Sequence, residues 1–447
     1  MPRPRRRKQK LQSEPIQTRI EELTPEGRGF AQIDGKATFI DFALPGETVL
    51  FQYTRSSSKF DEGRTLEVID AAADRVTPPC EHFGVCGGCS LQHLAADAQV
   101  LAKQQALLNH FQQLAQVQPE TVLEPLRGPQ LAYRYKARLG VKYVAKKGKV
   151  LVGFREKANR YLAELKTCKV LHASVGEQLE QLGELIMGLE ARQSIPQIEV
   201  AVSDTVTCLV FRNLQPLSEA DRQQLSRYAA KHMLQIMLQP AGPDSIVPLY
   251  PEQVKPLYYE LQNHQVRIEF QPNDFTQVNP QINKQMVDRA LQYLDLQGTD
   301  QVLDLFCGLG NFTLPMARRA AHVTGIEGVE VMVRKARDNA RLNSIDNVEF
   351  HAADLSADVS AYPWLRKNYD KILLDPPRSG AMEALPFLGK LGASIIVYIS
   401  CHPATLARDA QVLVHEFGYR LTAAGVMDMF PHTAHVESMA VFIKQRK

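Results

Sequence analysis

The sequence lacks the features that mark membrane, secreted and fibrous proteins. No apolar run approaches the ~20 residues that a transmembrane helix needs, and no apolar segment follows the basic N-terminus as it would in a secretory signal. Only 7 of the 447 residues are cysteines. This number is too small for a disulfide scaffold and is typical of a reducing compartment. We therefore expect a cytoplasmic protein with no membrane association.

An excess of one charge is also missing, since 52 Lys and Arg oppose 49 Asp and Glu. The basic residues are nevertheless concentrated in two places. Residues 1–10 contain six of them and no acid, and residues 127–160 contain eleven against the single acid Glu156. In the second block they alternate with rings such as Tyr133 and Tyr143. Cations beside aromatic rings are typical of nucleic-acid surfaces. One such block alone is equally expected on a solvated β-sheet face, but two blocks in one chain favour binding to RNA or DNA, and we interpret the second block as an RNA surface of the central domain.

The chain is long enough for about three domains, and its patterns divide it into four segments. Residues 1–12 form a basic arm that we expect to be disordered. Residues 13–71 contain short alternating runs between turn signals, which predicts a small β-barrel that binds RNA. Residues 72–270 are predicted to form a central α+β domain. In residues 271–447 strands alternate with helices, which predicts a parallel, doubly wound α/β domain of the Rossmann type.

Three cysteines lie close together in a glycine-rich loop, and a fourth, Cys168, follows later in the chain. The spacing of the first three is Cys80-x5-Cys86-x2-Cys89. Four thiolates suit either zinc or a [4Fe-4S] cluster. Zinc ribbons usually pair two Cys-x2-Cys knuckles, and the second knuckle is absent here, so the spacing favours iron–sulfur; unligated core cysteines are the alternative. His82 and His93 are further ligand candidates that we expect at the surface.

Residues 301–311 have the pattern of a buried strand, a glycine turn and a helix start, which is where doubly wound folds bind nucleotides. The dinucleotide fingerprint is incomplete because its third glycine is missing. Asp304 beside the turn would repel a pyrophosphate but suits a cationic ligand such as S-adenosylmethionine. Glu327 ends the next strand, where a carboxylate can accept ribose hydroxyls, and Asp354 after the third strand could meet an adenine amino group. Each acid alone could be a helix cap, but the ordered set of three argues against that interpretation.

Two further strands end in residues that suit group-transfer chemistry. Asp375 begins an Asp-Pro-Pro-Arg segment, and Cys401 follows the next strand. A cysteine at the carboxyl end of a parallel strand lies over the ligand crevice, where a nucleophile is useful, although a lone cysteine is more often a small buried residue. Near the C-terminus, Glu437 and His435 are both candidates for a general base, and their spacing does not choose between them.

Five segments, in this order, resemble those of the RNA uracil-5-methyltransferases: 275–279, 304–311, 375–378, 400–403 and 435–437. Residues 13–71 are similar to the OB-like TRAM domain of that family, and the three-plus-one cysteines are similar to its iron–sulfur site. The resemblance is strongest to the bacterial members that methylate uridine 1939 of 23S ribosomal RNA. One departure is His402, where relatives commonly have asparagine.

The resemblance implies a reaction and a set of functional residues. Cys401 would be the nucleophile that adds to carbon 6 of the uracil, and Glu437 the base that removes the proton from carbon 5, so the Cys401 thiol should have a lowered pKa. The helix near residues 94–120 would pack on the catalytic domain, and we expect a monomer whose partner is 23S ribosomal RNA. S-adenosylmethionine would be bound by Gln277, Phe306, Asn311, Glu327, Asp354 and Asp375. A [4Fe-4S] cluster would be held by Cys80, Cys86, Cys89 and Cys168.

Other functions fit parts of this pattern. The same chemistry could act on another ribosomal or transfer RNA uridine, and a non-catalytic iron–sulfur protein could bind RNA without consuming S-adenosylmethionine. An amino-group methyltransferase would use Asp375 and the prolines, but such enzymes usually have an aromatic residue where Arg378 stands. A radical enzyme would have a Cys-x3-Cys-x2-Cys run, which the sequence lacks.

Overall fold

The computed structural model describes residues 14–357 and 359–445. The predicted basic arm, residues 1–12, lies outside the described residues. Within the described part of the chain, no helix is long and apolar enough to cross a lipid bilayer.

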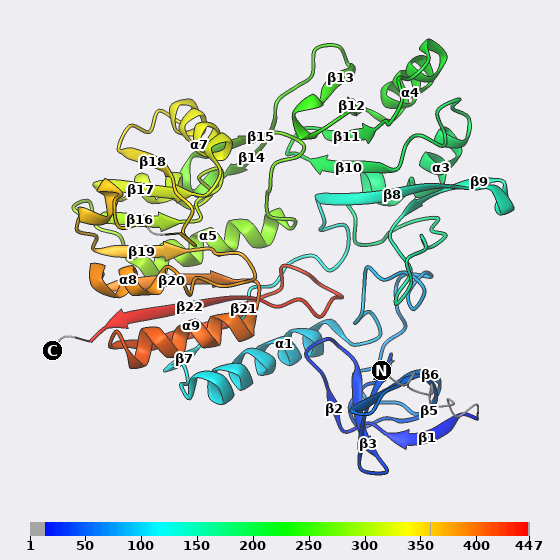
Figure 1. Ribbon diagram of the computed structural model, residues 1–447, viewed down its shortest axis with the longest axis horizontal. Coiled ribbons are helices and arrows are strands. Elements are labelled where there is room, and N and C mark those ends of the chain that lie inside the picture. The colour runs from blue at the N-terminus through cyan, green and yellow to red at the C-terminus, as the bar shows by residue number, and fades with distance from the viewer. Residues whose placement is uncertain (1–13, 358, 446–447) are drawn as a thin grey trace, which may run out of the picture. The chain divides into compact units, whose positions relative to one another are not determined.

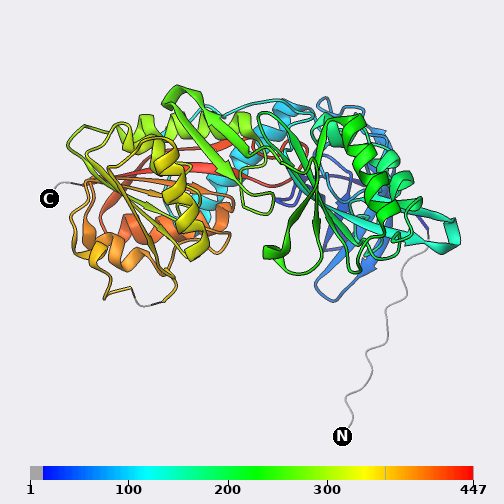
Figure 2. The same cartoon turned by 90° about the horizontal axis from the view of Figure 1, so that it is seen from above.

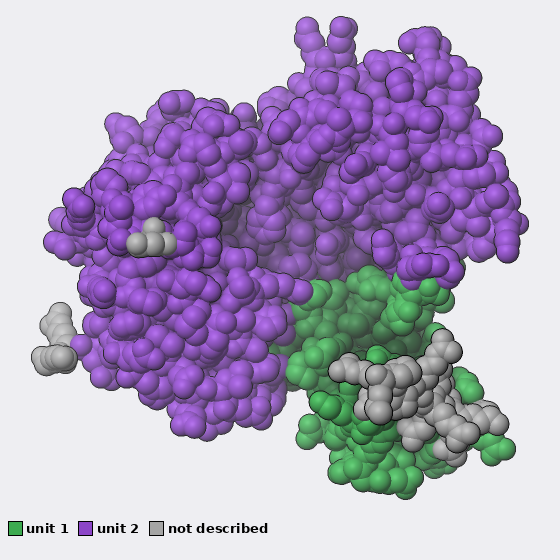
Figure 3. Space-filling view, in the orientation of Figure 1, with its two compact units in different colours: residues 1–103, 156–159, 431–435 green, residues 104–155, 160–430, 436–447 purple. Residues whose placement is uncertain are grey.

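The chain forms two compact units (Figure 3). Unit 1 contains the chain up to Lys103 together with residues 156–159 and 431–435. Unit 2 contains the remainder, and it carries two large sheets and a separate hairpin of β14 (Leu257–Leu261) and β15 (Val266–Phe270).

Unit 1 is built on one six-stranded sheet, in the order β1-β5-β6-β4-β3-β2 (Figure 1). Neighbouring strands are antiparallel except β4 and β6, which are parallel. Side chains of alternate residues point to opposite faces of the sheet, and one face buries a small core around Ile40, Val49 and Phe51. The short strands predicted here are therefore confirmed. They are β1 (Ile16–Arg19), β2 (Glu22–Leu23), β3 (Gly29–Ile33), β4 (Lys36–Asp41), β5 (Thr48–Ser56) and β6 (Phe60–Asp70).

The first sheet of unit 2 has the strand order β13-β12-β11-β10-β8-β9. It is mixed, because β11 and β12 are parallel while the other pairs are antiparallel. Helix α3 contacts β9, and α4 contacts β12. The strands are β8 (Lys136–Val144), β9 (Lys149–Gly153), β10 (Gln197–Val202), β11 (Thr207–Arg212), β12 (Leu234–Gln239) and β13 (Val247–Tyr250). The helices are α2 (Ala173–Gly176), α3 (Leu179–Met187) and α4 (Glu219–His232).

The basic and aromatic block at 127–160 is only partly a surface. Tyr133 is 2% exposed. The Lys136 ammonium donates a hydrogen bond to the Pro272 carbonyl, and burial lowers the pKa of Lys136 to about 8. Arg138 is exposed but is paired with an acid of β10 at 2.6 Å. The interpretation of the whole block as a nucleic-acid surface is therefore too broad, because its residues alternate between the core and solvent.

The second sheet of unit 2 has the order β18-β17-β16-β19-β20-β22-β21-β7, with helices on both of its faces (Figure 2). The first five strands are parallel, which confirms the predicted doubly wound domain. The antiparallel pair β21 and β22 was not predicted. The strands are β7 (Thr121–Val122), β16 (Gln301–Leu305), β17 (His322–Glu327), β18 (Val348–Ala352), β19 (Lys371–Leu374), β20 (Ile395–Ser400), β21 (Tyr419–Met427) and β22 (Glu437–Lys444). The helices are α5 (Pro280–Leu294), α6 (Thr313–Ala317), α7 (Glu330–Leu342), α8 (Leu385–Leu391) and α9 (Pro403–His415).

Helix α1 (Ala96–His110) continues through a π-helical turn over Phe111–Ala115. That turn packs on α9, where His415 Nε2 lies 2.9 Å from the Ala115 carbonyl oxygen. The side chain of Gln104 accepts a hydrogen bond of 2.9 Å from a backbone amide of β21. The C-terminal half of this helical segment is thereby fixed against the second sheet of unit 2.

Candidate active site

The carboxyl ends of four parallel strands meet at one edge of the second sheet of unit 2. Leu305 of β16 pairs with Ile326 of β17 and with Leu374 of β19. Leu374 in turn pairs with Tyr398 of β20. Residues at or just beyond these strand ends therefore share that edge, where α/β sheets bind their ligands. Four of the predicted site residues are among them, namely Phe306, Glu327, Asp375 and Cys401.

Cys401 and Glu437 are brought together by the antiparallel pairing of β20 with β22. Ser400, the last residue of β20, is opposite Ser438, whose hydroxyl donates to the Ser400 carbonyl at 3.2 Å. The next position along the ladder places Cys401 beside Glu437. Glu437 is 3% exposed, whereas His435 is exposed. Of the two candidate bases, Glu437 is the one that the strand pairing sets next to the thiol.

Negative side chains dominate the surroundings of the Cys401 thiol. Burial raises the pKa of Cys401, and the nearby Glu437 and Asp375 carboxylates raise it further. Arg378 is the cation that opposes them. Burial also raises the pKa of Asp375 to about 7 and the pKa of Glu437 well above its ordinary value. The predicted lowering of the Cys401 pKa is therefore wrong for the polypeptide by itself, because desolvation and two acids outweigh one arginine.

The glycine turn after β16 combines left-handed backbone with a buried acid. Phe306, Gly308 and Gly310 have φ angles of 65°, 54° and 93°, which the two glycines adopt without a Cβ penalty. Asp304 is 0% exposed, and its Oδ2 accepts a hydrogen bond of 2.5 Å from the Thr313 hydroxyl. Its Oδ1 has no partner among the described residues, and burial raises the pKa of Asp304 to about 8. A buried carboxylate oxygen without a partner is costly and suits a cationic ligand.

Two other predicted cofactor residues, Glu327 and Asp354, already have local partners. Glu327 accepts hydrogen bonds from the amides of Gly308 (3.1 Å) and Val329 (3.2 Å). Asp354 is exposed and accepts from the amide and the hydroxyl of Ser356, at 2.9 and 2.6 Å. Both acids therefore stabilise turns after their strands, and any contact with a ligand would be additional.

Asn311 and Gln277 share two neighbours. The side chains of Asn311 and Asn283 exchange two hydrogen bonds of 2.9 Å, and the Tyr259 hydroxyl donates to Asn311 Oδ1 at 2.9 Å. Asn283 and Tyr259 also line a small cavity together with Gln277. The hydrogen-bond network thus connects the turn after β16 with the start of α5.

Comparison with known proteins identifies the family of this chain. Residues 96–446 match the model of the tRNA (uracil-5-)-methyltransferase family. The chain is 52% identical to the 23S rRNA (uracil(1939)-C(5))-methyltransferase RlmD of Alcanivorax borkumensis, over 99% of both chains. It is 51% identical to the protein of the same name from Methylococcus capsulatus, over 98% of this chain and 99% of the relative. The chain belongs to the tRNA (uracil-5-)-methyltransferase family. The predicted resemblance to RNA uracil-5-methyltransferases is confirmed.

A solved structure of this family has the same architecture. The Pyrococcus abyssi tRNA (uracil-54, C5)-methyltransferase in complex with S-adenosyl-L-homocysteine matches with a TM-score of 0.73 and 22% identity, covering 96% of this chain and 100% of that chain. The match confirms a multidomain α/β architecture with mixed sheets and a methyltransferase fold.

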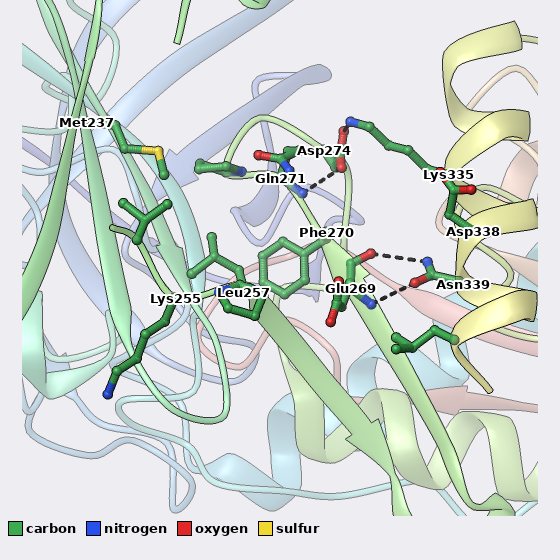
Figure 4. A pocket seen from close by; sticks show the side chains of 14 residues that line it. Met237, Lys255, Leu257, Glu269, Phe270, Gln271, Asp274, Lys335, Asp338 and Asn339 are labelled. Carbon is green, nitrogen blue, oxygen red and sulfur yellow. Dashed lines mark hydrogen bonds and ion pairs between the residues drawn. The ribbon is translucent and has the colours of Figure 1, made fainter. Parts of the chain in front are cut away.

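In this family member, residues 271–279 are held at several points beside the site. Figure 4 shows the Lys335 side chain extending from α7 to Asp274, with 2.5 Å between Nζ and Oδ1. Asp274 Oδ2 accepts from the Gln271 amide at 2.7 Å, and all three residues line a cavity of about 330 Å³. Phe275 is 72% exposed on this segment. Asp274 and Lys335 were not predicted from the sequence, because an ion pair across 61 positions leaves no local pattern.

Three of the predicted cluster ligands, Cys80, Cys86 and Cys89, lie on one loop of unit 1. The Phe83 amide donates to the Cys80 carbonyl at 3.0 Å, and the Gly88 amide donates to Cys86 Sγ at 3.4 Å. Burial raises the pKa of Cys86. All three cysteines are half-buried, and none of them forms a disulfide. Among the residues that the structure describes, no group of three or more His, Cys, Asp or Glu side chains is arranged as a metal site.

The fourth predicted ligand, Cys168, belongs to unit 2, where its amide donates to the Gly176 carbonyl at 2.7 Å. His93, which was expected at the surface, is 1% exposed in unit 1 and packs against Phe42 and Phe83. Both of its ring nitrogens are buried without a partner in the described structure, and burial lowers the pKa of His93 to about 3. The imidazole is therefore neutral at physiological pH.

Proposed function

We propose that this protein methylates carbon 5 of uridine 1939 in 23S ribosomal RNA, with S-adenosylmethionine as the methyl donor. The observation that carries the proposal is the pairing of β20 with β22, because it sets the Cys401 thiol beside the Glu437 carboxylate. A nucleophile next to a base serves covalent addition to a pyrimidine ring and has no use in a protein that only binds RNA. The relatives that are 51% and 52% identical over nearly the whole chain carry the name of this activity, which supports the substrate.

The acids at the strand ends suit the charge of the methyl donor. S-adenosylmethionine carries a sulfonium and an ammonium, and it supplies an electrophilic methyl group. Asp304 has a buried oxygen without a partner in the described structure, and Asp375 is a half-buried acid that directly follows β19. A positive charge between them would favour the ionised form of both carboxyls, and it would equally favour the thiolate of Cys401. The proposed donor contacts are Gln277, Phe306, Asn311, Glu327, Asp354 and Asp375.

Cys401 and Glu437 would divide the chemistry between them. Cys401 Sγ forms a bond to carbon 6 of the uracil, and the electron pair of the ring double bond moves toward the carbonyl oxygen, so that carbon 5 becomes nucleophilic. After carbon 5 has taken the methyl group, whose bond to the sulfonium breaks and leaves the donor as a neutral thioether, Glu437 would accept the proton from carbon 5. The double bond then re-forms as the bond from carbon 6 to sulfur breaks, which returns the thiolate.

The proposal is tested with RNA substrates that separate the alternatives. Purified protein is incubated with the methyl donor and either 23S ribosomal RNA or transfer RNA from a strain that lacks the modification. We expect 5-methyluridine at position 1939 of the ribosomal RNA and none in transfer RNA. Methylation confined to transfer RNA, or methyl groups on exocyclic nitrogen, would reject the proposal, as would the absence of donor consumption.

We also infer that unit 1 supplies an RNA-binding surface of the TRAM type. Three half-buried rings, Phe30, Phe39 and Phe60, form a ladder with centroid separations of 6.0 and 5.6 Å. The guanidinium groups of Arg28 and Arg55 lie 5.7 and 6.0 Å from the second and third rings. Aromatic rings flanked by cations bind single-stranded RNA by stacking and by charge.

Replacing Phe39 with leucine should raise the KM for RNA about tenfold and leave kcat unchanged, because a stacked base contributes ~1–3 kcal/mol to binding alone. Steady-state kinetics with the ribosomal RNA fragment measure both constants. Tyr53→Leu is the matched control, since Tyr53 is a half-buried ring of β5 outside the ladder. Equal KM values for the Phe39→Leu variant and the wild type would contradict an RNA surface at this position.

We further propose that Cys80, Cys86, Cys89 and Cys168 hold a [4Fe-4S] cluster with a structural role. The support is chemical: none of the four cysteines is used in a disulfide, three share one glycine-rich loop, and a backbone amide already donates to the sulfur of Cys86. Amide donors of this kind are common around cluster sulfurs.

The Cys86→Ala variant should therefore lose the brown colour and most of about four iron atoms per chain, together with RNA binding. Iron analysis, absorbance near 400 nm and RNA filter binding measure these losses. Cys208→Ala, which removes a buried thiol of β11, should retain the iron. A colourless wild type with one zinc ion would overturn the cluster, and activity that follows the reduction potential would overturn its structural role.

A further inference from the structure

The loop that begins at Asp375 is fastened to helix α9 by a buried carboxylate. Asp409 of α9 is 0% exposed. Its Oδ2 accepts hydrogen bonds from the Ala381 amide and from the Tyr398 hydroxyl, both at 2.7 Å. Its Oδ1 accepts two more from the Arg408 guanidinium, at 2.9 and 2.7 Å. Four donors from three elements therefore converge on one carboxylate.

The same helix makes two further contacts with this loop. Arg408 donates to the Ser379 carbonyl at 2.8 Å, and the Thr405 hydroxyl donates to the Arg378 carbonyl at 3.2 Å. Gly380 lies between Ser379 and Ala381 with φ +81°, and a Cβ there would come within 2.6 Å of both the Arg408 guanidinium and the Asp409 carboxylate. The loop is thus clamped onto the first two turns of α9, and only glycine fits at its centre.

The N-terminal end of helix α9 also contacts the loop that carries Cys401. Helix α9 begins two residues after Cys401, and His402 caps it, because its Nδ1 accepts from the Thr405 amide at 3.3 Å. Histidine thereby takes the capping role that an asparagine would have at this position. The His402 amide in turn donates to the Ser400 hydroxyl at 3.1 Å. The first two turns of helix α9 therefore hold both the loop that carries Cys401 and the loop that carries Arg378.

We propose that Asp409 is a positioning residue for methyl transfer, which fixes the Asp375–Arg378 loop relative to the Cys401 thiol. The inference rests on the proposed function, since only a shared reaction requires the two loops to keep a fixed distance. From this loop, Asp375 raises the pKa of Cys401 and Arg378 lowers it. A shift of the loop by ~1 Å is enough to reduce a reaction rate about 100-fold.

The test compares Asp409→Asn with a matched variant. Asp409→Asn should lower kcat about 100-fold and leave the KM for RNA within about threefold. The alkylation of Cys401 by iodoacetamide, followed by mass spectrometry of its peptide, should begin at a lower pH, because a displaced loop admits water to the thiol. Tyr398→Phe removes one hydrogen-bond donor from Asp409 and should lower kcat by an intermediate factor. This variant still tests the proposal if Asp409→Asn fails to fold.

Asp221→Asn is the control. Asp221 is a carboxylate of unit 2 that is 2% exposed, and it accepts hydrogen bonds from the backbone amides of Glu190 and Ala191, which lie 31 and 30 positions earlier in the chain. This substitution should lower the melting temperature without changing kcat or the alkylation profile. Asp409→Asn and Tyr398→Phe variants that behave like this control would refute the positioning role. A wild type that transfers no methyl group would instead refute the proposed function, and the alkylation profile would then show only whether Asp409 fixes the loop beside the Cys401 thiol.

Discussion

The Cys401→Ala variant is expected to lose methyl transfer by roughly 10⁴-fold or more while it still binds S-adenosylmethionine. Alanine removes the sulfur that would bond to carbon 6 of the uracil. Cys307, which follows β16 at the same sheet edge, cannot replace it, because Cys307 is 4% exposed and burial raises its pKa well above the ordinary value. Donor affinity should stay within about threefold of the wild type, since the thiol offers at most a weak hydrogen bond. Radiolabelled methyl transfer and calorimetry measure the two quantities.

A trapped covalent protein–RNA adduct distinguishes a variant that has lost catalysis from a variant that has lost its fold. With 5-fluorouridine at the target position, the wild type should form a protein–RNA complex that survives denaturing electrophoresis, because a base cannot remove fluorine from carbon 5. The Cys401→Ala variant should form none. Cys208→Ala is again the control, since it deletes a fully buried thiol of β11 and should retain both turnover and adduct. Normal turnover by Cys401→Ala would contradict covalent catalysis.

Much of the site's location could be predicted from the sequence, because buried parallel strands are recognisable in it as apolar runs. Strands β16, β19 and β20 are buried almost throughout, so each appears as an apolar run that ends at a polar or reactive residue. Parallel strands place those ends at one edge, which brings Asp375 and Cys401 together without further information. The roles of these residues came from the family resemblance and not from periodicity.

The remainder depends on contacts between distant segments. The pairing of β20 with β22, across 38 positions, places Glu437 beside the Cys401 thiol and so favours it over His435 as the base, and no local pattern encodes that register. The raised pKa of Cys401 likewise depends on acids from two other strands. Lys136 appeared to be part of a basic surface, but the Pro272 carbonyl that binds it lies 136 positions away.

The Glu437→Gln variant is expected to stop after methyl transfer. Glutamine preserves the shape of the side chain but cannot accept the proton from carbon 5, so the bond from carbon 6 to sulfur has no route to break. A covalent protein–RNA complex that carries the transferred methyl group should therefore accumulate, and turnover should fall about 10²–10⁴-fold. Electrophoresis under denaturing conditions, after a reaction with labelled donor, measures the complex.

The pH dependence of product release provides the second test of this base. Burial raises the pKa of Glu437 well above its ordinary value, and Asp375 raises it further. Because a base must be ionised to act, release by the wild type should accelerate as the pH rises through that raised pKa, well above the ~4.3 of a free glutamate. The acceleration should vanish in Glu437→Gln and persist in His435→Ala. If His435→Ala accumulates the adduct while Glu437→Gln releases its product, the proton leaves through the imidazole instead.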